Sequence, residues 1–508
     1  MPSVKRSASS TPGSSPSKKV KRRSSTSSPE ATAVLGQEGS RWRDWPAPLE
    51  QIEQAREFFR ECAREQALSI IVPDKDADGL SSGMVVWKTL TTLGLPSDLI
   101  KVFLLGKGTS LFSPIEQERM ESLINESLSE EDSATPVAST STSPPPSSSK
   151  AGKRAVRVII VDQGSRPGPP LVRKEKVNTH DLRTIIIDHH MSTSWPEEST
   201  VLTACNSAPI ATSSLLTYIT CAPLHPDIPR LTMWYAILGV FGDLSPSEIN
   251  WGDPNSEWPA SQEMIDLGDE VKRIGKKPLS SAVSAINAPR RTAEYNVIDA
   301  WNVLFKAKTP NEIARSGILQ EARDKVNREV ERCTHTAPKF SMDGRVALLR
   351  IDSGYQVHPV IATRWAGTLK SAKKLQMIMV ENPGHNPDPE LTSFSCRLAN
   401  QFRKLPEAER PNLIELLKEY GELTGGGFMD RVGNDFARGH KEATGGIIKK
   451  SDFELFVKGM KIGEKDPNAP PTKKELKAKP AQSNTLKSYF NITPKKEEAA
   501  NHKPIAVD

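Results

Sequence analysis

Three short apolar runs in the chain each lead directly into an acidic residue. They are Leu68–Pro73 before Asp74, Val156–Val161 before Asp162, and Thr184–Ile187 before Asp188. Uninterrupted apolar runs of this length are typical of strands that are buried on both faces, as in a parallel sheet. Ligands of open α/β sheets bind at the carboxyl ends of the strands. The pattern therefore predicts one crevice in which several carboxylates meet.

Helical patterns lie between and beyond these runs. We predict helices over residues 48–66, 78–90 and 208–219, and a further strand over residues 99–105. A fourth apolar run, residues 231–243, also ends at an acid, Asp243. Residues 260–335 are charged and helical in pattern, and we expect them to lead into a second domain.

The second domain is predicted to mix strands with helices. Strands are expected at 345–351, 376–380 and 393–397, and helices near 359–369 and 412–420, before a glycine-rich segment at 424–446. The predicted fold class is α/β, with a parallel-sheet domain at 41–270, a helical connector at 271–340 and a smaller mixed α/β domain at 341–461. A chain of 508 residues has room for two such domains.

Three stretches lack apolar periodicity and are rich in serine, proline and charge. They are residues 1–40, 127–153 and 462–508, and we predict that they are disordered. Strand-like runs flank the middle stretch, so we interpret it as a surface insertion within the first domain. Near the N-terminus, Lys5-Arg6 and the basic run 18–23 have the spacing of a two-part nuclear localisation signal. This predicts a nuclear import receptor as partner and a nuclear location, with a basic tail that binds polyanions non-specifically as the alternative.

Overall composition narrows the function only slightly. The formal net charge of +6 permits a polyanionic partner without requiring one. The five cysteines are scattered and have no C-x-x-C spacing, which favours reduced thiols in an intracellular protein. No apolar stretch reaches membrane-spanning length and no signal peptide is evident, so we expect no membrane partner.

The acid-terminated runs predict a metal site. His189 and His190 directly follow Asp188, so the crevice offers imidazoles as well as carboxylates. This donor set suits Mn²⁺ or Mg²⁺ better than an ion that prefers thiolates. Two such ions about 4 Å apart can clamp the attacking and leaving oxygens of a phosphoryl displacement. A purely structural role is harder to defend, because each acid would lie against the core without a partner.

Four segments resemble, in order, the four motifs of the DHH phosphoesterase superfamily. They are Asp74–Gly79, Val161–Gly164, Asp188–His190 and Gly242–Asp243. Within the superfamily the chain is similar to the RecJ-like single-strand exonucleases, and residues 439–446 resemble the Gly-Gly-His segment of the associated DHHA1 substrate domain. The similarity covers residues 65–460 as an ordered set, which is more specific than any one motif.

The resemblance implies a role for each matching residue. Asp162 would bridge two divalent cations, with Asp76, His189 and Asp243 completing one site and Asp74 serving the other. The implied metal ligands are Asp74, Asp76, Asp162, His189 and Asp243, and the implied catalytic residues are Asp162, Asp188, His189 and His190. Asp188 would orient its neighbours, and His190 would face the scissile phosphate. The implied substrate-binding residues of the second domain are Ser395, Arg397, Gly439 and His440, because arginine binds phosphate bidentately and glycine permits close backbone approach.

Two positions depart from the usual family pattern, and a third is open to two interpretations. Val72 stands where RecJ-like enzymes usually have a histidine, so one ion site lacks an imidazole that Asp78 or water would replace. Arg438 stands where glycine is usual, and it either adds a phosphate contact or crowds the loop. His358 is a further candidate for substrate binding, although a packed histidine is as good an interpretation.

The C-terminal stretch contains one aliphatic and aromatic cluster, Ser483–Phe490. Leu486, Tyr489 and Phe490 would share one face of a single helical turn, which is suited to a hydrophobic pocket. The cluster resembles the motif that binds the sliding clamp (PCNA), although the usual glutamine is Ser483 here and Gln482 comes one position early. A chance aromatic pair is the alternative.

Together these features predict a metal-dependent phosphodiesterase with its active site between the two domains. The activity that the resemblance implies is a RecJ-like exonuclease acting 5′ to 3′ on single-stranded DNA in nuclear replication or repair. One alternative is a phosphatase for nucleotides or small oligonucleotides on the same fold. Another is a catalytically weak scaffold of the replication machinery, which the replacement at Val72 favours.

Overall fold

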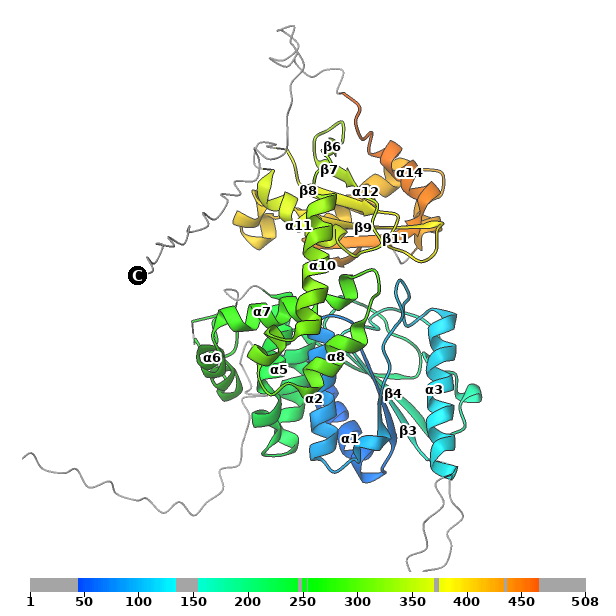
Figure 1. Ribbon diagram of the computed structural model, residues 1–508, viewed down its shortest axis with the longest axis vertical. Coiled ribbons are helices and arrows are strands. Elements are labelled where there is room, and N and C mark those ends of the chain that lie inside the picture. The colour runs from blue at the N-terminus through cyan, green and yellow to red at the C-terminus, as the bar shows by residue number, and fades with distance from the viewer. Residues whose placement is uncertain are drawn as a thin grey trace, which may run out of the picture.

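The computed structural model describes residues 44–133, 154–244, 249–253, 255–369, 374–433 and 436–465. These residues form two α/β domains, one above the other in Figure 1. The predicted nuclear localisation signal and the segment 483–490 that resembles the clamp-binding motif lie outside the described residues. None of the described helices combines the length and the apolar character needed to cross a membrane.

The described part of the first domain is built on a five-stranded sheet in which every strand is parallel to its neighbours. The strands are β1 (Leu68–Pro73), β2 (Ile100–Val102), β3 (Val156–Val161), β4 (Leu182–Asp188) and β5 (Ser199–Thr203), in the order β2-β1-β3-β4-β5. All residues of β1 and β3 are buried, which confirms the predicted parallel sheet. The register pairs Pro73 with Val161 and Val161 with Ile187, so the acids that follow these strands come out at one level.

Helices cover both faces of this sheet. One face packs against α1 (Leu49–Arg64), α2 (Ala77–Thr92), α4 (Ser213–Cys221) and α5 (Ile228–Asp243). The other face packs against α3 (Pro114–Ser133). The fourth apolar run forms most of the buried helix α5. The predicted start of the insertion at residue 127 is too early, because residues 127–133 belong to α3.

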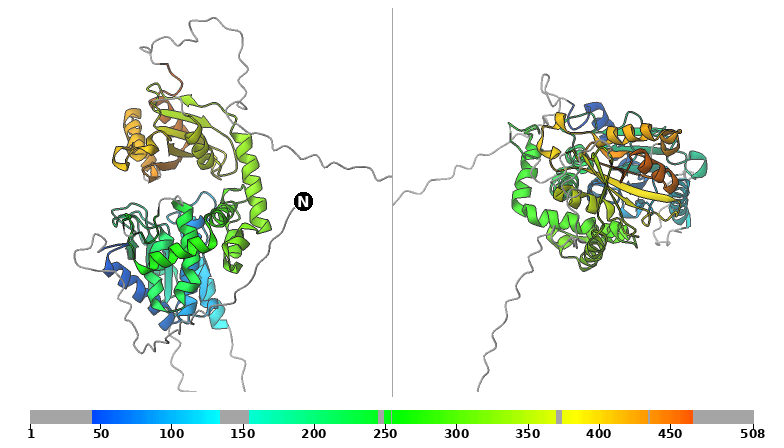
Figure 2. Two further views of the ribbon diagram at one scale, coloured as in Figure 1. Left: turned by 90° about the vertical axis from the view of Figure 1, so that its left-hand side faces the viewer. Right: turned by 90° about the horizontal axis from the view of Figure 1, so that it is seen from above.

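Within the described residues 255–335, five α-helices follow, which confirms the helical prediction for residues 260–335. They are α6 (Gln262–Ile274), α7 (Lys276–Ile286), α8 (Val297–Lys306), α9 (Pro310–Ala314) and α10 (Gly317–Cys333). Residues of α6 to α9 pack into the core of the first domain, as does Leu319 at the start of α10. Further along α10, Val326 and Val330 belong to the core of the second domain. The helix α10 thus joins the two domains, as the side view in Figure 2 shows.

The described part of the second domain contains a six-stranded mixed sheet. Its strands are β6 (Lys339–Phe340), β7 (Val346–Arg350), β8 (Met377–Asn382), β9 (Leu391–Leu398), β10 (Arg438–His440) and β11 (Ala443–Lys449), in the order β10-β11-β9-β8-β7-β6. Strands β7 and β8 are parallel, and the other described pairs are antiparallel. One face packs on α11 (His358–Thr368), and the other packs on α12 (Leu413–Thr424), α13 (Phe428–Val432) and α14 (Lys450–Gly459). The predicted mixed α/β domain is confirmed.

Candidate metal centre

The carboxyl ends of β1, β3 and β4 bring the predicted metal-site residues together. Asp162 follows β3 directly, is buried, and has a left-handed backbone conformation with a φ of 64°. Asp74 follows β1, and His189 and His190 follow β4. The remaining acid, Asp243, arrives on a different kind of element, since it is the last residue of α5.

One set of candidate ligands centres on His189. Single ligand atoms of Asp78, Asp162, His189 and Asp243 all lie within 4.8 Å of one another. His189 Nε2 lies 3.4 Å from Asp162 Oδ1 and 3.2 Å from Asp243 Oδ2. This nitrogen is buried and makes no hydrogen bond to the described residues. A buried imidazole nitrogen that faces two carboxylate oxygens without a hydrogen bond is in the position of a ligand that shares a cation with them.

A second set consists of carboxylates alone. Ligand atoms of Asp74, Asp76 and Asp162 also lie within 4.8 Å of one another. Asp162 belongs to both sets, which fits the bridging role that the resemblance implies, but Asp76 groups with Asp74 and not with His189 and Asp243 as the resemblance implied. Val72 is buried in β1 and offers no ligand atom, so oxygen atoms are the protein ligands available here. Such a site suits a hard cation such as Mg²⁺ or Mn²⁺.

Asp78 does not take the place of the missing histidine. Its carboxylate accepts hydrogen bonds from the backbone nitrogens of Ser213, at 2.8 Å, and Ser214, at 3.1 Å. It thereby holds the start of α4 against the sheet edge. Burial and the nearby Asp243 raise the pKa of Asp78 to about 6. Asp78 groups with His189 and not with Asp74, so the suggestion that it fills the second set is wrong.

Asp188 organises the turn that carries the two histidines. Its Oδ1 accepts hydrogen bonds from the backbone nitrogen of His189, at 2.8 Å, and from Nδ1 of His190, also at 2.8 Å. Its Oδ2 accepts a bond from the backbone nitrogen of Ser165. Burial alone would raise the pKa of Asp188, but His190 outweighs burial and lowers it. This arrangement leaves Nε2 of His190 free of Asp188 and fixes the orientation of the ring.

The buried carboxylates repel one another. Burial raises the pKa of Asp162 well above its ordinary value, and Asp78 and Asp76 raise it further. Burial and Asp74 raise the pKa of Asp76 in the same way. A divalent cation would relieve this repulsion, because it stabilises the charged form of every carboxylate around it. The donor set and its electrostatics therefore fit divalent cations.

The second domain adds His440 to this site. Its ring centroid lies 5.7 Å from that of His189 and 5.5 Å from that of His190, against which it stacks. Burial and the two neighbouring histidines lower the pKa of His440 to about 4. Gly439, with a φ of 117°, precedes it, and a Cβ there would lie 2.6 Å from the carbonyl oxygen of Ala443. The β10–β11 hairpin thus needs glycine at this position.

Ser395 and Arg397 lie next to each other on β9. Arg397 donates from Nη1 to Ser395 Oγ, at 2.9 Å, and from Nε to Thr363 Oγ1, at 3.2 Å. Burial lowers the pKa of Arg397 to about 10, and Arg403 and Arg290 contribute to the shift. The side chain of Arg438 lies outside the part of the chain that is described. Arg397 is therefore a partly buried cation held in place by neutral partners.

His358 is buried at the start of α11. Its ring centroid lies 5.6 Å from that of His385, and its Nδ1 makes no hydrogen bond to the described residues. Burial, together with His385 and Arg397, lowers its pKa well below the ordinary value. The ring is therefore neutral at pH 7 and lies beside Arg397, which leaves both interpretations of this residue open.

The sequence pattern did not single out two arginines of this site. Arg290 Nη2 lies 3.7 Å from Asp76 Oδ2, and its Nη1 donates to Gln356 of the second domain. Burial lowers the pKa of Arg291 to about 9, with Arg290 adding to the effect. We find no side-chain partner for Arg291 among the described residues. The sequence signal for these two residues is an Arg-Arg pair in a charged helical segment. Such a pair does not predict that this part of the chain lies beside the metal site.

Comparison with known proteins identifies the first domain. Residues 69–239 match the family model described as the DHH family, N-terminal domain. The chain carries a DHH-family domain. A search among curated proteins finds no match to the sequence.

Two solved structures share the fold of both domains. RecJ from Thermus thermophilus, in complex with Mn²⁺, superposes with a TM-score of 0.51 at 15% identity, over 82% of this chain and 55% of that protein. The DHH domain of a protein described as a member of a ribosomal protein family gives a TM-score of 0.55 at 13% identity, over 86% of this chain and 95% of that one. At these identities the likeness shows a RecJ-like fold. This chain spans only about half the length of the Thermus protein.

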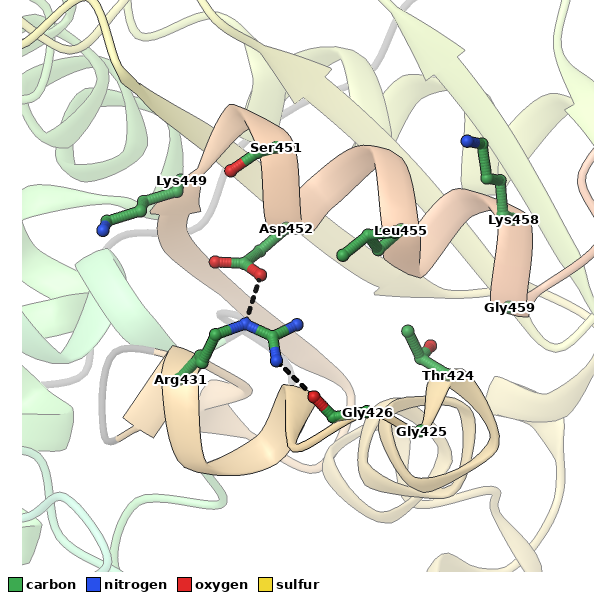
Figure 3. Close-up of a pocket in the computed structure, with 10 residues that line it drawn as sticks. All are labelled: Thr424, Gly425, Gly426, Arg431, Lys449, Ser451, Asp452, Leu455, Lys458 and Gly459. Atoms are coloured by element: carbon green, nitrogen blue, oxygen red, sulfur yellow. Dashed lines mark hydrogen bonds and ion pairs between the residues drawn. The ribbon is translucent and has the colours of Figure 1, made fainter.

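A pocket of about 730 Å³ lies in the second domain beside α14 (Figure 3). It is lined by residues from the end of α12 to α13 and from α14, among them Thr424, Leu455 and Gly459. Arg431 lies across it and donates to Asp452 Oδ1, at 2.8 Å, and to the carbonyl oxygen of Gly426. None of the residues that line this pocket is a predicted site residue.

We expect Mn²⁺ to stabilise the protein more at neutral than at acid pH. The folded-state pKa values of Asp162 and Asp76 are raised, so at low pH a cation must displace their protons before it binds. At a free Mn²⁺ concentration about 100 times Kd, binding adds about 2.7 kcal/mol to the free energy of unfolding. Calorimetry should show the Mn²⁺-induced rise in Tm growing between about pH 5.5 and about pH 7.5.

Asp162→Asn is the matched control, because it removes the shared ligand with little change in volume. It should abolish most of the Mn²⁺-induced rise at both pH values. A rise of equal size in the variant, or one that does not depend on pH, would show that Mn²⁺ binds elsewhere.

Proposed function

We propose that this protein is a metal-dependent phosphodiesterase that degrades single-stranded DNA from its 5′ end. One observation carries the proposal: two sets of metal ligands share Asp162, and two partly buried cations lie near them, Arg291 near Asp76 and Arg397 near His440. Carboxylates attract divalent cations, and arginines without a carboxylate partner attract phosphate. A substrate that binds both must carry phosphate oxygens and reach across the two domains.

The chain's own residues divide the work. When bound, divalent cations would supply Lewis acidity and activate water for attack on phosphorus. These cations would be held by Asp162, which both sets share, together with Asp74 and Asp76 in one set and His189 and Asp243 in the other. Asp188 orients His190, whose ring stacks against His440 of the second domain. Arg291, Arg397 and His440 would bind the phosphate groups and keep the strand in line.

The polarity and the preference for DNA are supported by the resemblance to RecJ-like exonucleases. Ser395, Arg397, Gly439 and His440 match the segments that hold the phosphate end of a strand in that family. In this protein these residues belong to the second domain, and His440 among them lies against His189 of the metal site. A strand that reaches the metal site would present its terminal phosphate to these residues.

The direct test is hydrolysis of single strands labelled at the 5′ or 3′ end in the presence of Mn²⁺. Asp162→Ala and His189→Asn should each reduce the rate about a thousandfold, because cation chemistry supplies several kcal/mol of transition-state stabilisation and each 1.4 kcal/mol is a factor of about ten. The early products should carry the 5′-terminal nucleotide. Equal rates in wild type and both variants would refute the mechanism.

Arg291→Ala should weaken binding of a 5′-phosphorylated single strand by roughly tenfold, since a hydrogen bond to a charged group contributes about 1.5–3 kcal/mol. The slope of log affinity against log salt should become less steep by about 0.7, because one phosphate contact is lost. Fluorescence anisotropy in EDTA measures both quantities without hydrolysis. Arg315→Ala removes the same charge from an exposed position and should change neither quantity.

A second function is favoured by one observation. Val72 leaves the set formed by Asp74, Asp76 and Asp162 without an imidazole, which would weaken one cation site. A protein with this defect could serve as a scaffold of the replication machinery that binds a strand without cutting it. The hydrolysis assay separates the two functions, because a scaffold would bind the labelled strands and leave them intact.

We further propose that the protein works in the nucleus and binds the sliding clamp (PCNA). The basic segments at residues 5–6 and 18–23 support nuclear import, and Leu486, Tyr489 and Phe490 support clamp binding. A nuclear clamp partner would bring a single-strand exonuclease to sites of replication and repair.

The clamp interaction predicts that Leu486→Ala combined with Tyr489→Ala weakens binding of the full chain to the clamp by roughly tenfold or more, because two of its three apolar anchors are lost. Isothermal titration calorimetry with the full chain and with a peptide of residues 475–508 measures the change. Lys487→Ala lies within the same segment but outside the apolar face, and it serves as the control. Unchanged affinity in the double variant would exclude this motif.

A further inference from the structure

Three histidines from the two domains form a cluster of their own. His189, His190 and His440 each offer a ring nitrogen, and these nitrogens lie within 4.8 Å of one another. The ring centroids of His189 and His190 are 4.6 Å apart. The first two belong to the DHH domain and the third to the β10–β11 hairpin of the second domain, so the cluster exists only while the domains are together.

The chemistry of this cluster differs from that of the carboxylate sets. Imidazole nitrogens suit Zn²⁺, whereas Mg²⁺ and Mn²⁺ prefer carboxylate oxygens. His190 already has the support that a zinc ligand needs, because its Nδ1 is bonded to Asp188 at 2.8 Å and its Nε2 remains for a metal. His440 keeps part of its surface exposed although its ring packs against those of His189 and His190, which gives an ion a route to the cluster.

We propose that His189, His190 and His440 form a Zn²⁺ site that bridges the two domains and competes with the catalytic cations. His189 is also a member of the carboxylate set with Asp162 and Asp243, and His190 is a member of a set with Asp162 and Asp188. An ion held by three imidazoles therefore draws both histidines away from the hydrolytic arrangement. It also links the hairpin to the DHH domain at the place where the strand would pass.

Binding of Zn²⁺ at this cluster stands on the geometry alone. Its inhibitory effect rests on the proposed nuclease function. The two claims need separate readouts, so that a protein without nuclease activity still gives a clear answer about the metal.

The experiment is a titration of the full-length protein with Zn²⁺, and in parallel with Co²⁺, whose visible absorption reports tetrahedral coordination. Wild type should bind one Zn²⁺ tightly and give the tetrahedral Co²⁺ spectrum. His440→Ala should weaken Zn²⁺ binding by roughly tenfold or more and abolish that spectrum, because one of three ligands is lost. Asp162→Asn should keep both, because its carboxylate is outside the cluster.

His335→Ala is the matched control, since His335 is an exposed histidine whose ion-pair partner is Glu331 of the preceding helix. It should bind Zn²⁺ as wild type does. The Mn²⁺-induced rise in Tm should persist in His440→Ala, which shows that this variant folds and retains the carboxylate sites. Unchanged Zn²⁺ affinity in His440→Ala, or loss of Zn²⁺ binding in Asp162→Asn, would overturn the proposal.

If the nuclease assay shows activity, micromolar Zn²⁺ added to the Mn²⁺ reaction should inhibit wild type, and excess Mn²⁺ should restore the rate, because both ions need His189. His440→Ala, measured against its own uninhibited rate, should need a higher Zn²⁺ concentration for the same inhibition. An unchanged requirement would place Zn²⁺ in the catalytic sets instead.

Discussion

Repulsion among buried carboxylates at one edge of a parallel sheet is the constraint on which the rest of this structure depends. The register of β1, β3 and β4 brings their acids to one level, where burial makes each charge costly. Part of the cost is met by the protein: the start of α4 donates to Asp78, and the turn after β4 donates to Asp188. Asp162 has Ser213 Oγ as a donor, at 2.9 Å, while the carboxylates around it raise its pKa. Because these acids have few hydrogen-bond donors, this part of the site favours the binding of cations.

Three arginines near these carboxylates crowd positive charge in the same way. Arg290 lies close enough to Arg291 and Arg397 to lower the pKa of both, and burial adds to the cost. Among the described residues, Asp76 is the counter-charge of this group, at 3.7 Å from Arg290. The cations and the carboxylates come from different elements, since Arg290 and Arg291 lie in the short 3-10 helix Pro289–Arg291 and Arg397 lies on β9.

The connection between the domains fixes the position of His440 relative to the carboxylates. The helix α10 is anchored by Leu319 in the core of the first domain and by Val330 in the core of the second. Lys107 of the first domain also donates to the carbonyl oxygens of Ala293, at 3.1 Å, and Gly354, at 2.7 Å. These contacts hold His440 against the turn that carries His189 and His190. Any motion that separates the domains would take His440 from the site while leaving the carboxylate sets whole.

The sequence by itself determined the sheet, the order of its acids and most of the residues that meet there, whereas the tertiary structure alone decided which residues join from afar. Apolar runs that end in aspartate have a strong local signal, because burial on both faces leaves few polar positions within a strand, such as Ser69 of β1 and Arg157 of β3. The apolar run 231–243 also ends in an acid, but a run that long fits a buried helix as well as a strand, and α5 is the element that delivers Asp243. Asp78 follows Asp76 at an alternate position of one motif, yet packing commits it to the backbone of α4. The approach of Arg290 to Asp76 and the meeting of His440 with His189 depend on how the helices fold back and how the domains dock. Local patterns cannot encode such contacts, because they arise from the path of the whole chain.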